Sequence, residues 1–159
     1  MLSFLEKNNQ IAWFFTLIIA AAIFYLSSQT FQGGGGKGYL SYIYHFSIFF
    51  FLAFFLLIAS IKGKLNKEIF FISLLLAILY GISDELHQSF VPGRYADVQD
   101  VLMNSVGIMT AAVVYILTII FRSGNLRNNN KSKDMDENVV NQLKEGLEDL
   151  KSKRIERVA

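Results

Sequence analysis

The feature that most constrains this chain is a series of four long segments that are apolar almost throughout. They cover residues 11–28, 39–61, 69–88 and 98–121. A helix needs roughly 20 apolar residues to cross the hydrocarbon core of a bilayer. Because 53% of the chain is hydrophobic and Phe alone occurs 15 times, one small water-soluble domain is a poor alternative. We therefore predict an all-α integral membrane four-helix bundle.

The third segment is the least apolar of the four. Only 15 uncharged residues, from Ile69 to Ser83, precede Asp84 and Glu85. At 1.5 Å per residue they reach about 22 Å into a core that is roughly 30 Å thick. The last turn of this helix is therefore expected to be polar while it still lies at membrane depth.

The first segment has a rival interpretation as a cleavable signal peptide, because Lys7 precedes an apolar run. However, the bulky residues Phe24, Tyr25 and Leu26 stand before Ser27, and no small-x-small cleavage site is present. We expect an uncleaved helix. The chain has no Cys, which excludes disulfides and thiolate metal ligands.

Basic residues in the connections predict the orientation in the membrane. The side with more Lys and Arg in short connections is normally cytoplasmic. We therefore expect both termini in the cytoplasm, and the connections 29–38 and 89–97 outside. The residues of the expected inner side are Lys7, Lys62, Lys64, Lys67, Arg122, Arg127, Lys131 and Lys133, against only Lys37 and Arg94 on the outer side.

The first outer connection contains four successive glycines, residues 33–36. A run of glycines cannot pack side chains and loses much conformational entropy when ordered, so it predicts a flexible connector. A phosphate-binding loop is the alternative, but the GKS/T ending and a preceding strand are both missing.

After residue 121 the chain becomes polar, and we divide it into a transmembrane domain, residues 11–121, and a charged cytoplasmic tail, residues 122–159. Residues 128–130, all Asn, predict a linker, and residues 136–158 look helical. Three interpretations of this amphipathic or disordered tail stay open: a solvated, partly disordered segment, a coiled-coil or partner helix, and a helix on the membrane surface. The helical interpretations depend on an apolar stripe at 3-4-3 spacing, Val140, Leu143, Leu147 and Leu150.

Polar residues gather where the third segment ends and the fourth begins. Spacings of three and four place Asp84, His87 and Gln88 on one helix face, with Glu85 about 100° round. A Val-Pro-Gly-Arg sequence, residues 91–94, predicts the tight turn that follows. The fourth helix then begins with one polar stripe, formed by Asp97, Asp100 and Asn104.

The helical rise per residue places polar residues of the first two helices at the same membrane depth as those of the third and fourth. At 1.5 Å per residue, polar residues of all four helices lie about 20 to 26 Å from the inner edge of the core. Ionisable groups inside the hydrocarbon layer are costly, so each is a functional-site hypothesis by default. The residues used for this estimate are Ser27 and Ser28 of the first helix, His45, Asp84 and Asn104.

Three kinds of chemistry fit this polar layer: a divalent metal site, a metal-free acid–base pair, and a binding or structural network. Asp84-x-x-His87 is a plausible pair of metal ligands. Simpler roles also stay open: Arg94 meeting lipid phosphates, Asp97 capping the fourth helix, and residues 27–29 (Ser-Ser-Gln) ending the first. The catalytic candidates are His45, Asp84, Glu85 and His87. The ligand-binding candidates are Ser28, His45, Asp84, Glu85, His87, Gln88, Arg94, Asp97, Asp100 and Asn104.

Residues 80–94, YGISDELHQSFVPGR, followed by Asp97, Asp100, Asn104 and Gly107, resemble the signature of the VanZ-like membrane proteins. Residues 24–29, FYLSSQ, and the pair His45-Phe46 support the resemblance, which covers about residues 11–121. It implies a multi-pass protein of the bacterial cytoplasmic membrane and, through the family's name, a link to resistance against the glycopeptide teicoplanin. Members of the family usually carry a Lys three residues before the second-helix His, where this chain has Tyr42.

The leading functional hypothesis is a cell-envelope protein with an outward-facing polar pocket. The pocket would bind a lipid headgroup, a lipid-linked cell-wall precursor or a lipoglycopeptide. The alternative is a membrane-embedded hydrolase or transferase, metal-dependent or metal-free, that acts through an activated water on an outer-leaflet substrate. A proton-coupled carrier is disfavoured because the polar layer does not continue toward the cytoplasm. Membrane lipids are the expected partners, and we expect no binding of nucleic acid.

Overall fold

The structure, a computed structural model, describes residues 2–30 and 39–156. These residues form five α-helices and contain no strand. Four of the helices, α2 to α5, are long and apolar enough to cross a membrane. The prediction of an all-α chain with four long apolar helices is therefore confirmed. The helices are α1 (Leu2–Lys7), α2 (Asn9–Ser27), α3 (Tyr39–Ile61), α4 (Lys67–Ser89) and α5 (Val98–Glu156).

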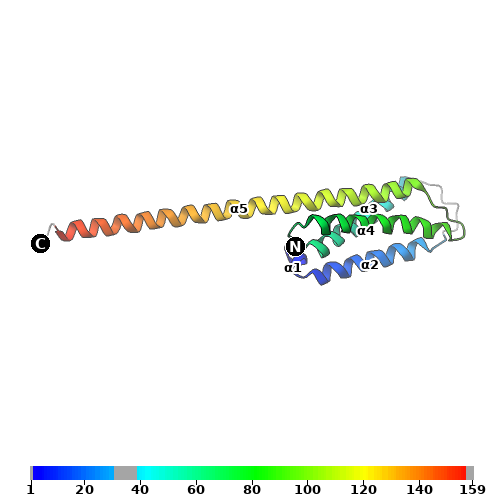
Figure 1. Cartoon of the computed structure of the whole chain (residues 1–159), viewed down its shortest axis with the longest axis horizontal. Coiled ribbons are helices and arrows are strands. Elements are labelled where there is room, and N and C mark those ends of the chain that lie inside the picture. The colour runs from blue at the N-terminus through cyan, green and yellow to red at the C-terminus, as the bar shows by residue number, and fades with distance from the viewer. Residues whose placement is uncertain (1, 31–38, 157–159) are drawn as a thin grey trace. The chain divides into compact units, whose positions relative to one another are not determined.

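The membrane-type helices pack in one compact unit, Met1–Ile119, which contains α1 to α4 and the first part of α5. Within this unit the helices run side by side, and α2 and α4 end where α3 and α5 begin (Figure 1). We call this the distal end of the bundle. The glycine run 33–36, predicted to be a flexible connector, lies outside the described residues.

Local sequence signals explain how α4 begins and how the chain turns after it. Asn66 precedes α4, and its side-chain oxygen accepts a hydrogen bond from the Ile69 backbone nitrogen at 3.1 Å, which caps the helix. After α4, Gly93 takes a positive φ of 80°, a conformation that glycine adopts at no steric cost. The Arg94 nitrogen donates to the Val91 carbonyl at 3.1 Å and closes the predicted turn.

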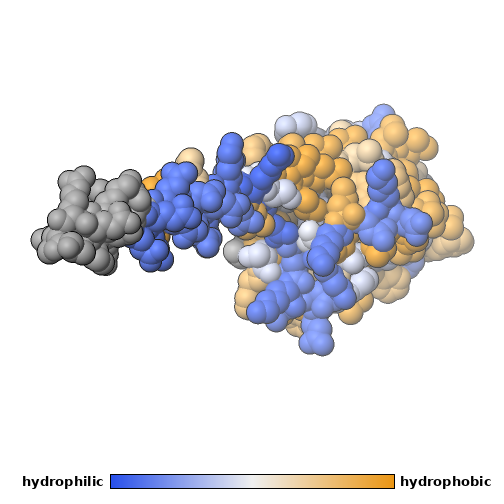
Figure 2. Space-filling model, turned by 60° about the vertical axis from the view of Figure 1, so that its left-hand side comes forward, coloured by the Kyte–Doolittle hydropathy of each residue, from blue (hydrophilic) through white to orange (hydrophobic). Residues whose placement is uncertain are grey.

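Small residues let the helices approach closely. Ala53, Ala77 and Ala111 are each at most 1% exposed, as expected for helices that associate in lipid by van der Waals packing. Many large apolar side chains instead point outward, among them Leu17, Phe71 and Leu86, which are 64%, 65% and 59% exposed. Figure 2 shows apolar side chains over much of the bundle surface in view. An apolar exterior of this extent suits a lipid environment.

Helix α5 differs from the sequence-based expectation. The linker predicted at residues 128–130 is wrong, because α5 continues as one helix from Val98 to Glu156. The part beyond Ile119 belongs to a second compact unit, Ile120–Ala159. In that unit Val140, Leu143 and Leu147 are 48%, 63% and 58% exposed. The described part of the tail, residues 122–156, is therefore helical, while its role as a partner helix or a surface helix stays a prediction.

Candidate functional site at the distal end

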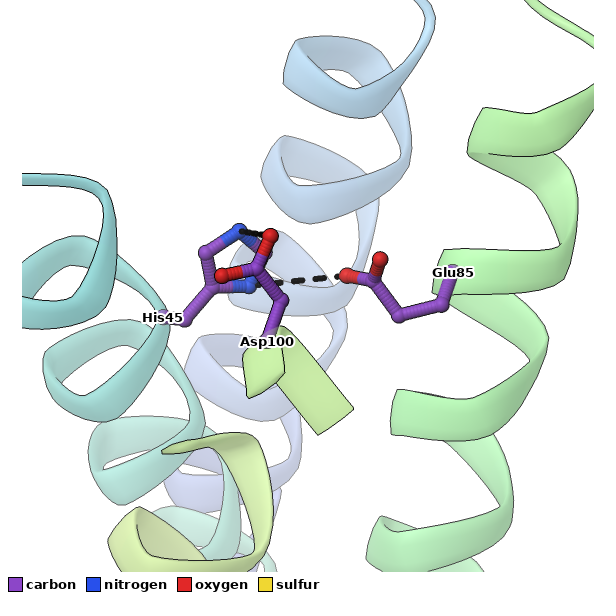
Figure 3. A group of neighbouring side chains, drawn as sticks. All are labelled: His45, Glu85 and Asp100. Carbon is purple, nitrogen blue, oxygen red and sulfur yellow. Dashed lines mark ion pairs between the residues drawn. The ribbon is translucent and has the colours of Figure 1, made fainter. Parts of the chain in front are cut away.

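His45 stands at the centre of the polar residues of the distal end. It lies on α3 and is 2% exposed. Its Nδ1 atom lies 3.0 Å from Oδ1 of Asn104 and 3.7 Å from Oε1 of Glu85, and its Nε2 atom lies 3.7 Å from Oδ2 of Asp100. Figure 3 shows the imidazole with the two carboxylates directed at it from α4 and α5. We call His45, Glu85, Asp100 and Asn104 the His45 cluster.

The His45 cluster has the donor set of a metal site. One donor atom from each of His45, Glu85 and Asp100 lies within 4.8 Å of the other two. One imidazole and two carboxylates can hold a divalent ion, since imidazole suits zinc and carboxylates suit manganese and magnesium. The same groups can also exchange a proton between ring and carboxylate.

A second group of buried polar side chains joins α2 to α4. The Ser27 hydroxyl donates to Oδ1 of Asp84 at 2.5 Å. The Gln88 amide nitrogen donates to Oδ2 of Asp84 at 3.0 Å and also to Oε1 of Glu85 at 3.2 Å. Ser27, Asp84 and Gln88 are 4%, 6% and 3% exposed. Gln88 thereby connects the Asp84 group to the His45 cluster through Glu85.

Asp97 connects the start of α5 to α4. Its backbone nitrogen donates to Oε2 of Glu85 at 3.2 Å, and its Oδ1 atom accepts from the Gln99 nitrogen at 3.0 Å. The second bond satisfies a free N–H group in the first turn of α5, so the capping role that the sequence suggested for Asp97 is confirmed. The first bond engages Oε2 of Glu85, whereas Gln88 bonds to Oε1.

Arg94 binds the end of α2. Its Nη1 atom donates to the carbonyl oxygens of Leu26 at 3.0 Å, Gln29 at 3.4 Å and Ser27 at 3.5 Å. The last carbonyls of a helix have no partner within the helix, and a nearby cation also interacts favourably with the helix dipole. Arg94 thus ties the α4–α5 turn to the carboxyl end of α2.

The comparison with known families adds one finding. The family model described as VanZ/LLP1 matches residues 5–122, well over half of the chain. The chain belongs to the VanZ/LLP1 family. Comparisons with curated proteins and with solved structures gave no significant match. The VanZ/LLP1 match includes the whole His45 cluster and ends near the boundary of the second compact unit.

The i, i+3 spacing of Asp84 and His87 suggested that they act together, but in this VanZ/LLP1 chain His87 contacts residues of α2 instead. Its ring stacks on Phe24, with centroids 4.7 Å apart, and its Nε2 atom lies 3.0 Å from the Ser28 hydroxyl. It is half-buried and is not among the three residues whose donor atoms converge. The structure therefore pairs His87 with Ser28 of α2, and brings Glu85 rather than His87 to His45.

The sequence placed Ser27 and Ser28 together in the polar layer, and the structure separates their contacts: Ser27 contacts Asp84, and Ser28 contacts His87. One contact of the distal end was not expected. The hydroxyl of Tyr42, which stands where VanZ-like proteins usually carry Lys, donates to Oε1 of Gln99. Adjacent serines at the end of an apolar helix have nearly the same depth, so only the rotation of α2 distinguishes them. No sequence signal pointed to Gln99.

Proposed function

We propose that this VanZ/LLP1 protein is a multi-pass protein of the bacterial cytoplasmic membrane whose distal end faces outward and binds the headgroup of an amphiphile. The orientation is supported by the excess of Lys and Arg at the opposite connections, which places both termini in the cytoplasm. In this orientation the polar side chains lie in the outer leaflet, at the level of lipid headgroups.

One observation carries the proposal: buried polar contacts join all four long helices at one level. Ser27 of α2 contacts Asp84 of α4, and His45 of α3 contacts Asn104 of α5. Glu85 of α4 links the two pairs, because its Oε1 atom lies 3.7 Å from Nδ1 of His45. Polar groups at membrane depth are expensive, and such residues normally face a bundle interior or a polar path for a ligand. Interhelical hydrogen bonds help to hold helices together in lipid, but polar groups from four helices at one level also favour a binding site, because each such group is costly in the membrane.

Charge indicates the chemistry of the ligand. Among the described residues of the distal end, the carboxyl groups of Asp84, Glu85, Asp97 and Asp100 outnumber the one guanidinium, that of Arg94. Carboxylates and amides bind amines and hydroxyls. We therefore propose a headgroup rich in amines and hydroxyls, such as that of a lipid-linked cell-wall precursor. A lipoglycopeptide such as teicoplanin presents the same groups, so the protein would contribute to resistance by capturing it.

The binding experiment uses the full chain in lipid nanodiscs and lipid-linked cell-wall precursors as titrants, followed by native mass spectrometry. Asp84→Asn keeps the shape of the side chain and removes its charge, and it should weaken saturable binding about tenfold, the expected effect of one charged hydrogen bond. Ser105→Ala is the matched control, because the Ser105 hydroxyl bonds to the Val101 carbonyl of its own helix. Wild-type protein without saturable binding would contradict the proposal.

A second experiment tests resistance. Cells that lack the protein should become more sensitive to teicoplanin, and wild-type protein should restore growth while Asp84→Asn should not. Equal teicoplanin sensitivity with and without the protein would remove the resistance role and leave lipid binding open to the first experiment.

A specific observation favours a second candidate function, a membrane-embedded hydrolase or transferase. His45 lies within 3.7 Å of two carboxylates, and a histidine oriented by a carboxylate is the usual general base for an activated water. Incubation with lipid-linked substrates and mass analysis of the products tests it. Turnover by wild type that disappears in His45→Gln supports it, while an absence of products from every such substrate contradicts it.

A further inference from the structure

We propose that the His45 cluster binds one divalent transition-metal ion, Zn²⁺ or Mn²⁺, with His45, Glu85 and Asp100 as ligands. This inference goes beyond the proposed function and does not depend on it, because a metal can be measured with or without a bound amphiphile. Four observations support it: the hydrogen-bond pattern of His45, the spacing of the donor atoms, the amide of Asn104, and the burial of the ligands.

The hydrogen bond to Asn104 determines which nitrogen of a neutral His45 has a lone pair. Oδ1 of Asn104 is an acceptor only, so Nδ1 of His45 must carry the hydrogen of their 3.0 Å contact. In the neutral ring, Nε2 then presents its lone pair toward Oδ2 of Asp100, 3.7 Å away. Two electron-rich atoms that face each other at this distance are stabilised by a cation between them.

The spacing of these atoms suits a metal ion better than a shared proton. The contact between Nε2 of His45 and Oδ2 of Asp100 measures 3.7 Å, whereas N–H···O hydrogen bonds are about 2.7 to 3.2 Å long. Two ligands of one metal ion, each about 2.0 to 2.2 Å from it, lie roughly 3 to 3.5 Å apart. One donor atom of Glu85 lies inside the same 4.8 Å group, so the three residues would enclose an ion if their donor atoms drew closer together.

Asn104 supplies an independent indication of a ligand. The residue is 1% exposed, and its Nδ2 atom has no hydrogen-bond partner among the described residues. Asn104 packs against Gly81, one turn before Glu85 on α4, where a Cβ atom would lie 3.6 Å from Nδ2. A buried amide donor is costly when unsatisfied. A water or hydroxide bound to the metal is an acceptor that it could reach.

The proposed ligands are buried, and neighbouring polar groups hold them in place. His45, Glu85 and Asp100 are 2%, 3% and 8% exposed, and two buried carboxylates beside one imidazole are stabilised by a dication. Asn104 orients His45 through Nδ1, while Gln88 and the Asp97 nitrogen hold the two oxygens of Glu85. Metal-binding histidines and carboxylates are typically held by such outer contacts.

The test is metal binding by the purified full chain without a histidine tag, in detergent and then in nanodiscs. After removal of metal with a chelator, ZnCl₂ and MnCl₂ are titrated separately by calorimetry, and Mn²⁺ is also followed by electron paramagnetic resonance. We expect one equivalent of at least one ion per chain and a higher melting temperature in its presence. Asp100→Asn and Glu85→Gln should abolish saturable binding, and Asn104→Ala should weaken it about 10- to 100-fold.

Two matched controls separate this site from adventitious binding. Glu68→Gln removes a carboxylate from the first turn of the same helix α4, and His87→Gln removes the other histidine of the chain. Both should keep the stoichiometry of the wild type. The proposal is overturned if folded wild type binds neither ion, if Glu85→Gln and Asp100→Asn still bind like wild type, or if His87→Gln abolishes binding. Thermal melting of every variant shows that the chains compared are folded.

Discussion

Gly107 of α5 lies directly against the backbone of Phe46 in α3. A Cβ atom at position 107 would lie 2.3 Å from the Phe46 carbonyl oxygen, closer than real Cβ contacts allow. Phe46 follows His45, and Gly107 lies three residues after Asn104, so this close approach stands beside the 3.0 Å contact of His45 with Asn104. The packing of two backbones therefore sets the geometry of the His45 cluster.

Gly107→Ala should destabilise the bundle by about 1 to 3 kcal/mol, the usual effect of overpacking a tight core. The measurement is thermal or denaturant unfolding in detergent. Gly124→Ala is the matched control in the same helix, because nothing lies within 4 Å of a Cβ atom there. We expect no loss of stability in that control, since Ala favours a helix more than Gly does. Equal stability of the two variants would contradict the close approach.

Ser27→Ala should destabilise the protein by about 1 to 3 kcal/mol, because it removes the donor to Oδ1 of the buried Asp84 carboxyl. Ser105→Ala, whose hydroxyl bonds to the Val101 carbonyl of its own helix, should change stability by no more than about 0.5 kcal/mol. Unfolding midpoints of both variants in one detergent check this prediction. If Ser105→Ala proved the more harmful change, Ser27 would not hold Asp84.

Arg94→Ala should loosen the carboxyl end of α2. Loss of the Nη1 bonds to Leu26 and Gln29 should speed amide hydrogen exchange of residues 26–30 roughly tenfold, the factor that about 1.4 kcal/mol of hydrogen bonding represents. Hydrogen–deuterium exchange with mass spectrometry measures the change. Lys64→Ala, in the α3–α4 connection at the other end of the bundle, should leave that segment unchanged. Unchanged exchange in Arg94→Ala would show that the clamp does not stabilise α2.

His45 and Asn104 should be energetically coupled. A double-mutant cycle with His45→Ala and Asn104→Ala should give a coupling free energy of about 0.5 to 3 kcal/mol, as for other residues in direct contact. Unfolding of the four proteins with and without ZnCl₂ measures it. The coupling should be larger with the ion if the metal proposal holds, because the ion strengthens the bond at Nδ1 by polarising the ring. A coupling of zero in both conditions would show that the contact contributes nothing.

The orientation can be tested with single cysteines, since the natural chain has none. Tyr95→Cys lies in the α4–α5 connection, where the native side chain is 80% exposed, and Lys64→Cys lies in the connection between α3 and α4. In intact cells a membrane-impermeant maleimide should label position 95 and leave position 64 unlabelled until the cells are opened. The reverse pattern would place the His45 cluster in the inner leaflet.

Much of the fold follows from hydropathy, because length and apolar content alone identify a membrane helix. The expected ends at residues 61 and 28 differ from those of α3 and α2 by at most one residue. The tail was the exception: three successive Asn residues predicted a break at 128–130, yet α5 passes through them. Asn lowers helix propensity only modestly, so the strong helix formers on both sides prevail.

The depth of the site residues in the membrane was predictable from the sequence, but the rotation of each helix about its axis, which decides which residues meet, was not. The 1.5 Å rise per residue placed His45, Asp84 and Asn104 at one level, and the structure brings them to one end of the bundle. Spacing on α4 suggested that Asp84 and His87 act together. The structure buries Asp84 and Glu85, and it turns His87 toward Phe24 and Ser28.

The sequence by itself determined the number of long apolar helices, their approximate ends and the level of their polar residues, because each of these depends on position along one helix. The tertiary structure alone decided which carboxylate meets His45. In lipid the exterior of a bundle is as apolar as its interior, so hydropathy does not define the buried face of a helix. That face is set by backbone contacts such as the one between Gly107 and Phe46, which no pattern along a single helix contains.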